Sequence, residues 1–176
     1  AKINDDIYVS GNLGDSYLGL LVLQKKIKLN NSSSNYFTSQ YFMPNIQLKL
    51  ANQLKSFANS SIDISDGLIA DLDKLINNQK FSYKLYLKDI PISFNLRKIL
   101  KSKKLSKINL ISKGDDYQVL FTASETKSSL IKKVSNKLGI KITKIGRIQN
   151  KSLKSSIIDE NNAVITLKNK GYFHKF

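Results

Sequence analysis

The feature that most constrains the fold is the repeated change from a strand-like to a helix-like hydrophobic pattern. Apolar and polar side chains alternate over Asp6–Gly11, whereas apolar residues recur at helical spacing over Asp15–Leu29. The same change follows at 61–65, a short strand pattern, and at 68–76, a helical one. A chain that switches between periods of two and 3.6 builds helices packed on a sheet. We therefore predict an α/β fold in one domain, which suits a length of 176 residues.

The remaining patterns predict the other elements of this domain. Residues 30–35 are polar and predict a loop, and Pro44 predicts the first turn of a helix that runs to about Ala58. Further strands are expected at 81–92, 117–121, 140–148 and 162–168. Ser124 and Gly139 bound a helix with an apolar face from Leu130 to Leu138.

Cysteine usage and hydropathy limit the cellular setting. The chain has no cysteine, so disulfides and thiolate metal sites are excluded, and a reducing compartment, the cytoplasm, is expected. The longest apolar run, Tyr17–Leu23, is far too short to span a bilayer. The first residues, which start at Ala1, lack the apolar core of a secretion signal. No membrane partner is predicted.

The net charge of +16 raises the question of nucleic-acid binding. The lysines are scattered, however, and the densest basic stretch, Arg97–Lys107, holds no aromatic residue that could stack on bases. Arginine, the commonest base-reading side chain, is scarce beside lysine. We interpret Arg97–Lys107 as a solvated helix or loop face. A basic nucleic-acid-binding domain stays open as an alternative, and it predicts binding that weakens steeply with salt.

Carboxylates gather in a segment that otherwise resembles core, Ser60–Leu72. Asp63 follows a strand pattern and Asp66 precedes a helix, whose N-terminal amides favour anions. A phosphate held there by Mg²⁺ would meet carboxylates on the metal side and amides on the other. Alternatively, Ser65 or Asp66 caps the helix. Both interpretations stay open from spacing alone.

A second acidic cluster lies at the edge of another apolar run, within Ile111–Ser124. Gly114, Asp115 and Asp116 lead there into the strand pattern of Tyr117–Phe121. Oxygen ligands without histidine or cysteine suit Mg²⁺ better than zinc. Taken alone, the two aspartates are equally consistent with an ordinary turn before a strand.

The motifs "IYVSGNLGDSYLGL", "IDISDGLIADL", "GDDYQVLFT" and "IGRI" occur in an order that resembles the thiamine-monophosphate kinase family. The resemblance covers nearly the whole chain and is specific when the second and third motifs are taken together. It implies an α+β sandwich type of α/β fold, with helices packed on a mixed sheet, as in the aminoimidazole ribonucleotide synthetase-like superfamily. It matches the family's C-terminal domain only. Residues 1–176 would form that domain, and the N-terminal ATP-binding domain would be absent from this chain.

The resemblance also implies a reaction and a set of site residues. The family phosphorylates thiamine monophosphate to thiamine diphosphate with ATP and Mg²⁺, as a homodimer. By the family's "DxSDG" motif, Asp63 and Asp66 would bind Mg²⁺ and Ser65 would contact ATP. By its "GEDYELLFT" motif, Asp115 would lie near the substrate. Tyr172 corresponds to an aromatic residue near the family's C-terminus and would pack on the substrate. No general base is expected, because the attacking phosphate oxygen is already anionic and the obstacle is electrostatic.

The sequence departs from the family pattern at two positions. Asp115 replaces the usual Glu, and Gln118 replaces a second Glu. Related enzymes of the superfamily, such as aminoimidazole ribonucleotide synthetase or selenophosphate synthetase, are the other enzymatic alternative. This chain alone is expected to catalyse nothing, because it would lack half of the site.

Overall fold

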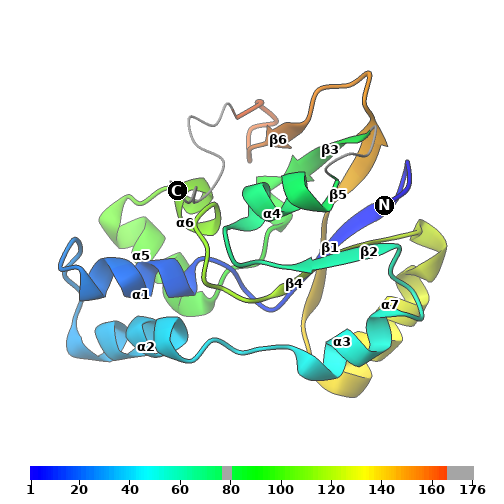
Figure 1. Cartoon of the computed structure of the whole chain (residues 1–176). Coiled ribbons are helices and arrows are strands. Elements are labelled where there is room, and N and C mark those ends of the chain that lie inside the picture. Colours follow the sequence, from blue (N-terminus) through cyan, green and yellow to red (C-terminus); the bar gives the residue numbers. More distant parts are fainter. Residues whose placement is uncertain (77–80, 166–176) are drawn as a thin grey trace, which may run out of the picture.

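A computed structural model of the protein describes residues 1–76 and 81–165 (Figure 1). Six strands form one sheet in the order β2-β4-β1-β5-β3-β6. Neighbouring strands are antiparallel except β3 and β6, which are parallel, so the sheet is mixed. The strands are β1 (Asp6–Ser10), β2 (Ser60–Asp63), β3 (Phe81–Tyr86), β4 (Val119–Ala123), β5 (Ile142–Asn150) and β6 (Ser156–Ile158). The predicted α/β class with a mixed sheet is confirmed.

The helices of the described residues lie on both faces of the sheet and beyond its ends. They are α1 (Asp15–Leu23), α2 (Asn31–Phe42), α3 (Leu48–Leu54), α4 (Leu68–Leu75), α5 (Phe94–Lys103), α6 (Lys107–Ile111) and α7 (Ser128–Leu138), with 3₁₀ turns η1 (Leu87–Asp89) and η2 (Glu125–Lys127). None of them, within the ranges described, is long and apolar enough to cross a membrane.

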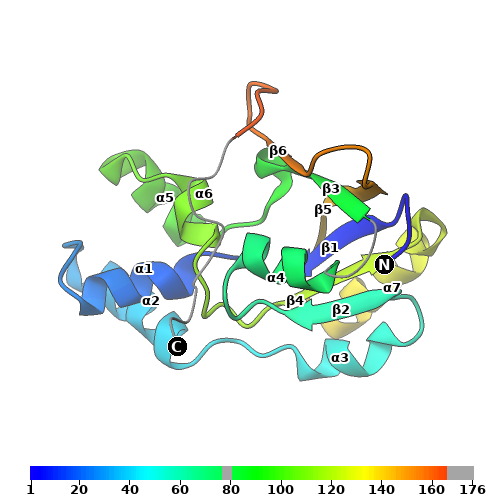
Figure 2. The ribbon, with the colours of Figure 1, turned by 45° about the horizontal axis from the view of Figure 1, so that its top comes forward.

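The central strand β1 is buried along its whole length and separates two apolar layers. Ile7 belongs to the layer that contains Leu68 and Leu72 of α4. Tyr8, the next residue, belongs to the layer that contains Leu50 of α3 and Ile131 of α7. Successive strand residues point to opposite faces, so one strand supplies both layers. Figure 2 shows α4 on one side of the sheet and α3 and α7 on the other. The helices α1, α2, α5 and α6 form a separate group beside the strand ends (Figure 1).

The predicted loop at 30–35 is wrong, because these residues begin α2. The side chain of Asn30 caps the helix by accepting a hydrogen bond from the Ser33 amide at 2.8 Å. The Thr38 hydroxyl donates to the Ser34 carbonyl within the helix, at 2.9 Å. Polar residues that bond to their own backbone are usually taken as loop signals, and here they line a helix that buries Phe37 fully.

Other predicted boundaries also shift. The helix expected from Asp15 to Leu29 ends at Leu23, and Lys25 has a positive φ of 56°. Pro44 lies before α3 and not in its first turn, since that helix begins at Leu48. The strand expected over 81–92 ends at Tyr86. The strand expected at 162–168 is described only to residue 165, where Val164 forms an isolated bridge with Ile158.

Candidate functional site

The two acidic clusters lie next to each other because they leave the same ends of neighbouring strands. β2 and β4 are antiparallel, with Asp63 opposite Val119. Beyond that pair the backbone bonds continue: the Ile64 amide donates to the Gln118 carbonyl at 2.8 Å, and the Tyr117 amide donates to the Ile64 carbonyl at 2.8 Å. The two clusters therefore form one site, although about fifty residues separate them in the sequence.

Two glycines let the loop after β2 and the loop before β4, the two acidic loops, approach each other more closely than other residues would allow. A Cβ added to Gly114 would lie 1.7 Å from the Ser65 carbonyl oxygen. A Cβ added to Gly67, which also has a positive φ of 113°, would lie 2.3 Å from the Ser112 carbonyl oxygen. The amide of Asp115 also donates to the Ser65 carbonyl at 3.0 Å. Each loop thus fixes the backbone of the other.

The start of α4 is capped from within the helix. One carboxylate oxygen of Asp71, which is fully buried, accepts hydrogen bonds from the amides of Ser65, Asp66 and Gly67 at 3.0, 2.9 and 3.1 Å. The interpretation of Ser65 or Asp66 as the cap is therefore wrong: Gly67 holds that position, and neither side chain caps the helix. Because Asp71 satisfies these amides, the side chains of Ser65 and Asp66 are left for other contacts.

The Asp116 side chain joins the second acidic loop to the first turn of α1. Its carboxylate accepts from the Gly14 amide at 2.8 Å and from the Ser16 amide at 3.4 Å. Burial raises the pKa of Asp116 to about 8, although these two amide bonds favour its charged form. Asp116 is therefore a structural tie between the loop and α1, and the following residue, Tyr117, has a positive φ of 50° that keeps it out of β4.

Gln118, which departs from the family pattern, is buried and links three segments. Its side-chain oxygen accepts from the Ser10 hydroxyl at 2.8 Å, and its side-chain nitrogen donates to the Asn45 carbonyl at 3.1 Å. A glutamate in the same place would have no N–H group to donate to Asn45. The amide is thus suited to hold the linker between α2 and α3.

A cavity of about 610 Å³ opens where α1 meets the two acidic loops. Three of the residues predicted for the site, Ser65, Asp66 and Asp115, line this cavity together. The other residues that line it are Tyr17, Leu20, Gln24, Tyr41, Lys113, Gly114 and Tyr117. We call this space the acidic-loop cavity. Its size and its mixture of aromatic and charged walls suit a small organic ligand.

The two carboxylates in this cavity differ in their surroundings. Asp66 forms an ion pair with Lys74, which also contacts Asp71 at 2.8 Å. Asp115 has a positive φ of 70° and no ion pair in the described part of the chain. Burial, and to a smaller extent the charge of Asp66, raise the pKa of Asp115 above its ordinary value. A cation or a hydrogen-bond donor beside Asp115 would therefore be stabilised.

One predicted site residue in the described part of the chain, Asp63, is not brought into this cavity. Asp63 is exposed at the end of β2 and lines an adjacent apolar groove with Ile46, Leu48 and Tyr117. Tyr172 lies outside the described residues. Within the described ranges, no three histidine, cysteine or acidic side chains are grouped closely enough to hold a metal ion by themselves.

Sequence reasoning missed several residues that build the site. Lys113 lines the cavity beside the acidic residues, and it is the basic residue directly before the Gly-Asp-Asp run. Tyr17 was predicted only as part of a helix, and Tyr41 was assigned to no element, yet both line the cavity. A helical pattern identifies the buried face of such a helix, but it does not show which other loop meets that helix.

No protein-family model matches the chain. Its curated relatives include two thiamine-monophosphate kinases of Buchnera aphidicola. The one from the Schizaphis graminum subspecies is 37% identical and the one from the Acyrthosiphon pisum subspecies is 34% identical, each over 99% of this chain. These alignments cover 54% of each relative, so the chain spans about half the length of the curated relatives it matches.

Solved structures share the fold. Thiamine-monophosphate kinase from Stenotrophomonas maltophilia K279a superposes with a TM-score of 0.78 at 27% identity, over 93% of this chain and 52% of that chain. The structure described as "AaThiL complexed with AMPPCP and TMP" has a TM-score of 0.77 at 24% identity, over 98% of this chain and 52% of that one. Escherichia coli HypE, at 13% identity over 99% of this chain and 52% of that one, has a TM-score of 0.70, which shows the fold alone.

Proposed function

Because this chain is a homologue of the thiamine-monophosphate kinases along nearly its whole length, we propose that it forms part of such a kinase. The reaction would transfer a phosphoryl group from ATP to thiamine monophosphate in line and yield thiamine diphosphate. The names of the relatives favour this activity over the other enzymes of the superfamily. The AMPPCP and TMP bound to AaThiL support ATP and thiamine monophosphate as the two substrates.

The observation that carries the proposal is the meeting of the two acidic loops at one cavity. Ser65 and Asp66 come from one loop and Asp115 from the other, and all three line the same space of about 610 Å³. Both loops are fixed by backbone bonds and by the close approach of Gly114 to Ser65. Phosphoryl transfer depends on positioning and on stabilisation of negative charge, so carboxylates held rigidly enough to fix a metal ion suit this chemistry.

The donor set of the site fits Mg²⁺. This ion is commonly held by one or two carboxylates together with substrate phosphates and water, so a preformed group of three acidic residues is not required. Asp66, in the cavity wall, and Asp63, which lines the adjacent groove at the end of β2, would hold it, in agreement with their place in the "DISDG" motif. When bound, Mg²⁺ would neutralise the phosphate charges and so let two polyanions approach each other.

The chain's own residues would orient the substrates around that ion. Ser65, whose backbone is fixed by Asp71 and Asp115, would present its hydroxyl to ATP. Asp115 would lie beside thiamine monophosphate, where the positive charge of a thiazolium ring would favour its ionised form. Lys113, in the wall of the same cavity, is placed to attract phosphate oxygens. None of these roles needs a side chain that removes a proton.

Several features of the family would lie outside the described residues or outside this chain. Tyr172 would pack on the substrate. An N-terminal ATP-binding domain would complete the nucleotide site, and the whole protein would act as a homodimer in the cytoplasm. The chain covers only 54% of its Buchnera relatives, which leaves length for such a domain.

The test is substitution of the two proposed magnesium ligands in the complete protein as encoded. We expect Asp63→Asn and Asp66→Asn each to lower the rate of thiamine diphosphate formation by at least about 10³-fold, because the phosphates would lose their main charge stabilisation. Glu125→Gln, which neutralises an exposed carboxylate away from the cavity, is the matched control. Near-normal turnover in either site variant, with an unchanged thermal unfolding midpoint, would contradict the metal role.

A further inference from the structure

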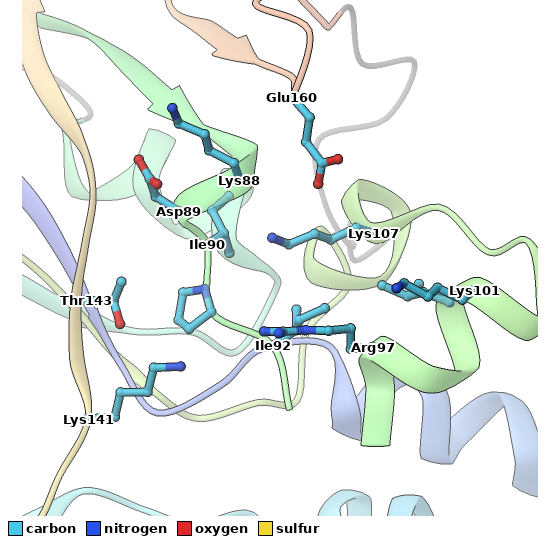
Figure 3. A pocket seen from close by; sticks show the side chains of 12 residues that line it. Lys88, Asp89, Ile90, Ile92, Arg97, Lys101, Lys107, Lys141, Thr143 and Glu160 are labelled. Atoms are coloured by element: carbon cyan, nitrogen blue, oxygen red, sulfur yellow. The ribbon is translucent and has the colours of Figure 1, made fainter. Parts of the chain in front are cut away.

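A second cavity of about 610 Å³ lies between η1, the start of α5, α6 and β5 (Figure 3). None of the residues that line it lines the acidic-loop cavity. Five basic residues and two acidic ones form much of its wall. They are Lys88, Arg97, Lys101, Lys107 and Lys141, with Asp89 and Glu160. We call this space the basic cavity. Its excess of positive charge points to an anionic ligand.

The basic side chains converge on one space from separate elements. Figure 3 shows the side chains of Arg97, Lys107 and Lys141 directed toward the region that Ile90 and Ile92 border. Arg97 belongs to α5 and Lys107 begins α6, while Lys141 precedes β5. The basic stretch Arg97–Lys107, which was interpreted as a solvated face, therefore places some of its charged side chains in the wall of a cavity. Residues that are scattered in sequence and meet in space form a local field that composition alone does not reveal.

These cations form no close ion pair within the described part of the chain, although Asp89 and Glu160 line the same cavity. None of the five basic residues has a carboxylate oxygen within 4.0 Å of its charged nitrogen atoms. Lys107 donates only to the Leu87 carbonyl, at 2.6 Å. Burial lowers the pKa of Lys107, which means that its charge is poorly solvated where it stands. An anion in the cavity would offset that cost.

The opposite wall of the basic cavity is apolar and fixed. Ile90, Pro91 and Ile92 line it, and Ile90 and Ile92 are otherwise buried in the core. The Pro91 carbonyl accepts a hydrogen bond from the Leu13 amide at 3.0 Å, which ties this wall to the loop before α1. A ligand that suits both walls has a compact multiple negative charge and an apolar portion beside it.

We propose that the basic cavity is a second ligand site of this protein and binds a small phosphate-bearing molecule. The phosphate would lie among Arg97, Lys107 and Lys141, and the apolar portion would lie against the wall that Ile90, Ile92 and the partly exposed Leu100 form. An arginine fork and two lysines match a phosphate dianion better than a single carboxylate. The volume of this hollow suits a small ligand. The site is independent of the proposed kinase activity.

The experiment titrates the purified full chain with inorganic phosphate and, separately, with phenyl phosphate, by calorimetry without magnesium. We expect phenyl phosphate to bind more tightly than inorganic phosphate, because its ring adds contact with the apolar wall. The variant Arg97→Gln/Lys141→Gln should weaken phenyl phosphate binding by at least about tenfold, as expected for lost charge-assisted hydrogen bonds. Both positions are exposed, so the fold should survive. In the native chain, the methyl NMR signals of Ile90 and Ile92 should shift on titration.

The matched control is Lys132→Gln/Lys133→Gln, which removes the same charge from the exposed face of α7. Its phenyl phosphate affinity should stay within about twofold of the native chain, since charges beyond a Debye length are screened. Equal weakening in both double variants would mean that general charge attracts the anion, and it would overturn the proposal. So would the absence of binding by the native chain at about 10 mM ligand. So would methyl shifts that appear around the acidic-loop cavity and not at Ile90 and Ile92.

Discussion

At the scale of single residues, the site depends on a close backbone approach at a glycine, Gly114. The backbone of Gly114 lies against the Ser65 carbonyl, and a Cβ there would stand 1.7 Å from the oxygen. Gly114 is not among the residues with positive φ, so the requirement for glycine comes from space and not from backbone conformation. Gly139, at the end of α7, presents the opposite case: its φ is 65° and an added Cβ would meet nothing within 4 Å.

This contrast predicts different costs for two substitutions of glycine by alanine. Gly114→Ala must push the acidic loops apart, and we expect it to lower the free energy of unfolding by about 3 kcal/mol, at the upper end for overpacking. Gly139→Ala should cost about 1 kcal/mol, the ordinary penalty of a left-handed residue. Urea denaturation of both variants measures the difference. If Gly114→Ala were as mild as Gly139→Ala, the loops would not be held as closely as described.

Residue types alone predicted part of the site and missed the rest for a physical reason. Ser65, Asp66 and Asp115 were predicted and do line one cavity. Their motifs contain oxygen ligands next to a turn, which is a local signal. The role of Asp71 was not predicted, because an aspartate in the first turn of a helix indicates only a favourable dipole contact. That its carboxylate accepts three amide bonds depends on the path of the preceding loop.

At the scale of elements, α1 is held by buried carboxylates from two directions. Asp116 accepts from the amides at its start, at Gly14 and Ser16. Asp15 accepts from the Tyr36 hydroxyl of α2 at 2.9 Å and from the Ser93 hydroxyl before α5 at 2.8 Å. Burial raises the pKa of Asp15 as it does that of Asp116. The position of α1, which supplies one wall of the acidic-loop cavity, is therefore sensitive to pH.

We predict that the protein loses stability as pH rises from about 4 to about 8. The pKa of Asp116 is about 8 in the folded state, against an ordinary value of 3.8 in the unfolded state. In this window the native state therefore keeps a proton that the unfolded state releases. Each pH unit within the window then costs at most about 1.4 kcal/mol. The loss should be complete above about pH 8. Urea denaturation at pH 5, 6.5 and 8 measures it.

The control for this pH dependence is Asp116→Asn, which keeps an oxygen acceptor for the Gly14 amide and cannot ionise. Its free energy of unfolding should vary less between pH 5 and pH 8, with a residual slope of the same sign from Asp15. Identical pH profiles for the native chain and Asp116→Asn would show that Asp116 does not cause the loss.

Elements were predicted well where a hydrophobic period is clear and poorly where polar side chains bond to their own backbone. β1 was predicted at 6–11 and runs over Asp6–Ser10, because its side chains alternate between two buried layers. α2 was missed, because its helical residues are mostly Ser, Asn and Thr, which favour turns unless a cap and a packing partner hold them. The partner is α1, the preceding helix, and the residue pattern of α2 does not show that the two helices pack together.

At the scale of the whole molecule, the described residues bring few charged side chains into the acidic-loop cavity. Two carboxylates, Asp66 and Asp115, line the acidic-loop cavity, and Asp66 is already paired with Lys74. No three acidic, histidine or cysteine residues in the described ranges are grouped to hold a metal unaided. ATP and thiamine monophosphate together would bring several negative charges, which the one lysine in the wall of this cavity, Lys113, would neutralise poorly by itself.

We therefore predict that the 176-residue chain alone forms thiamine diphosphate at least about 10³-fold more slowly than the full-length Buchnera aphidicola relatives, since electrostatic positioning supplies most of the rate in this chemistry. An assay that couples ADP release to a chromogenic reaction, with thiamine monophosphate and magnesium present, measures the difference. The far-ultraviolet circular dichroism of the same sample must show a folded protein, so that inactivity cannot be ascribed to unfolding. Turnover by the folded chain at a rate near that of the full-length relatives would mean that both halves of the site lie within these residues, and that Asp66 and Asp115 need no carboxylates beyond them.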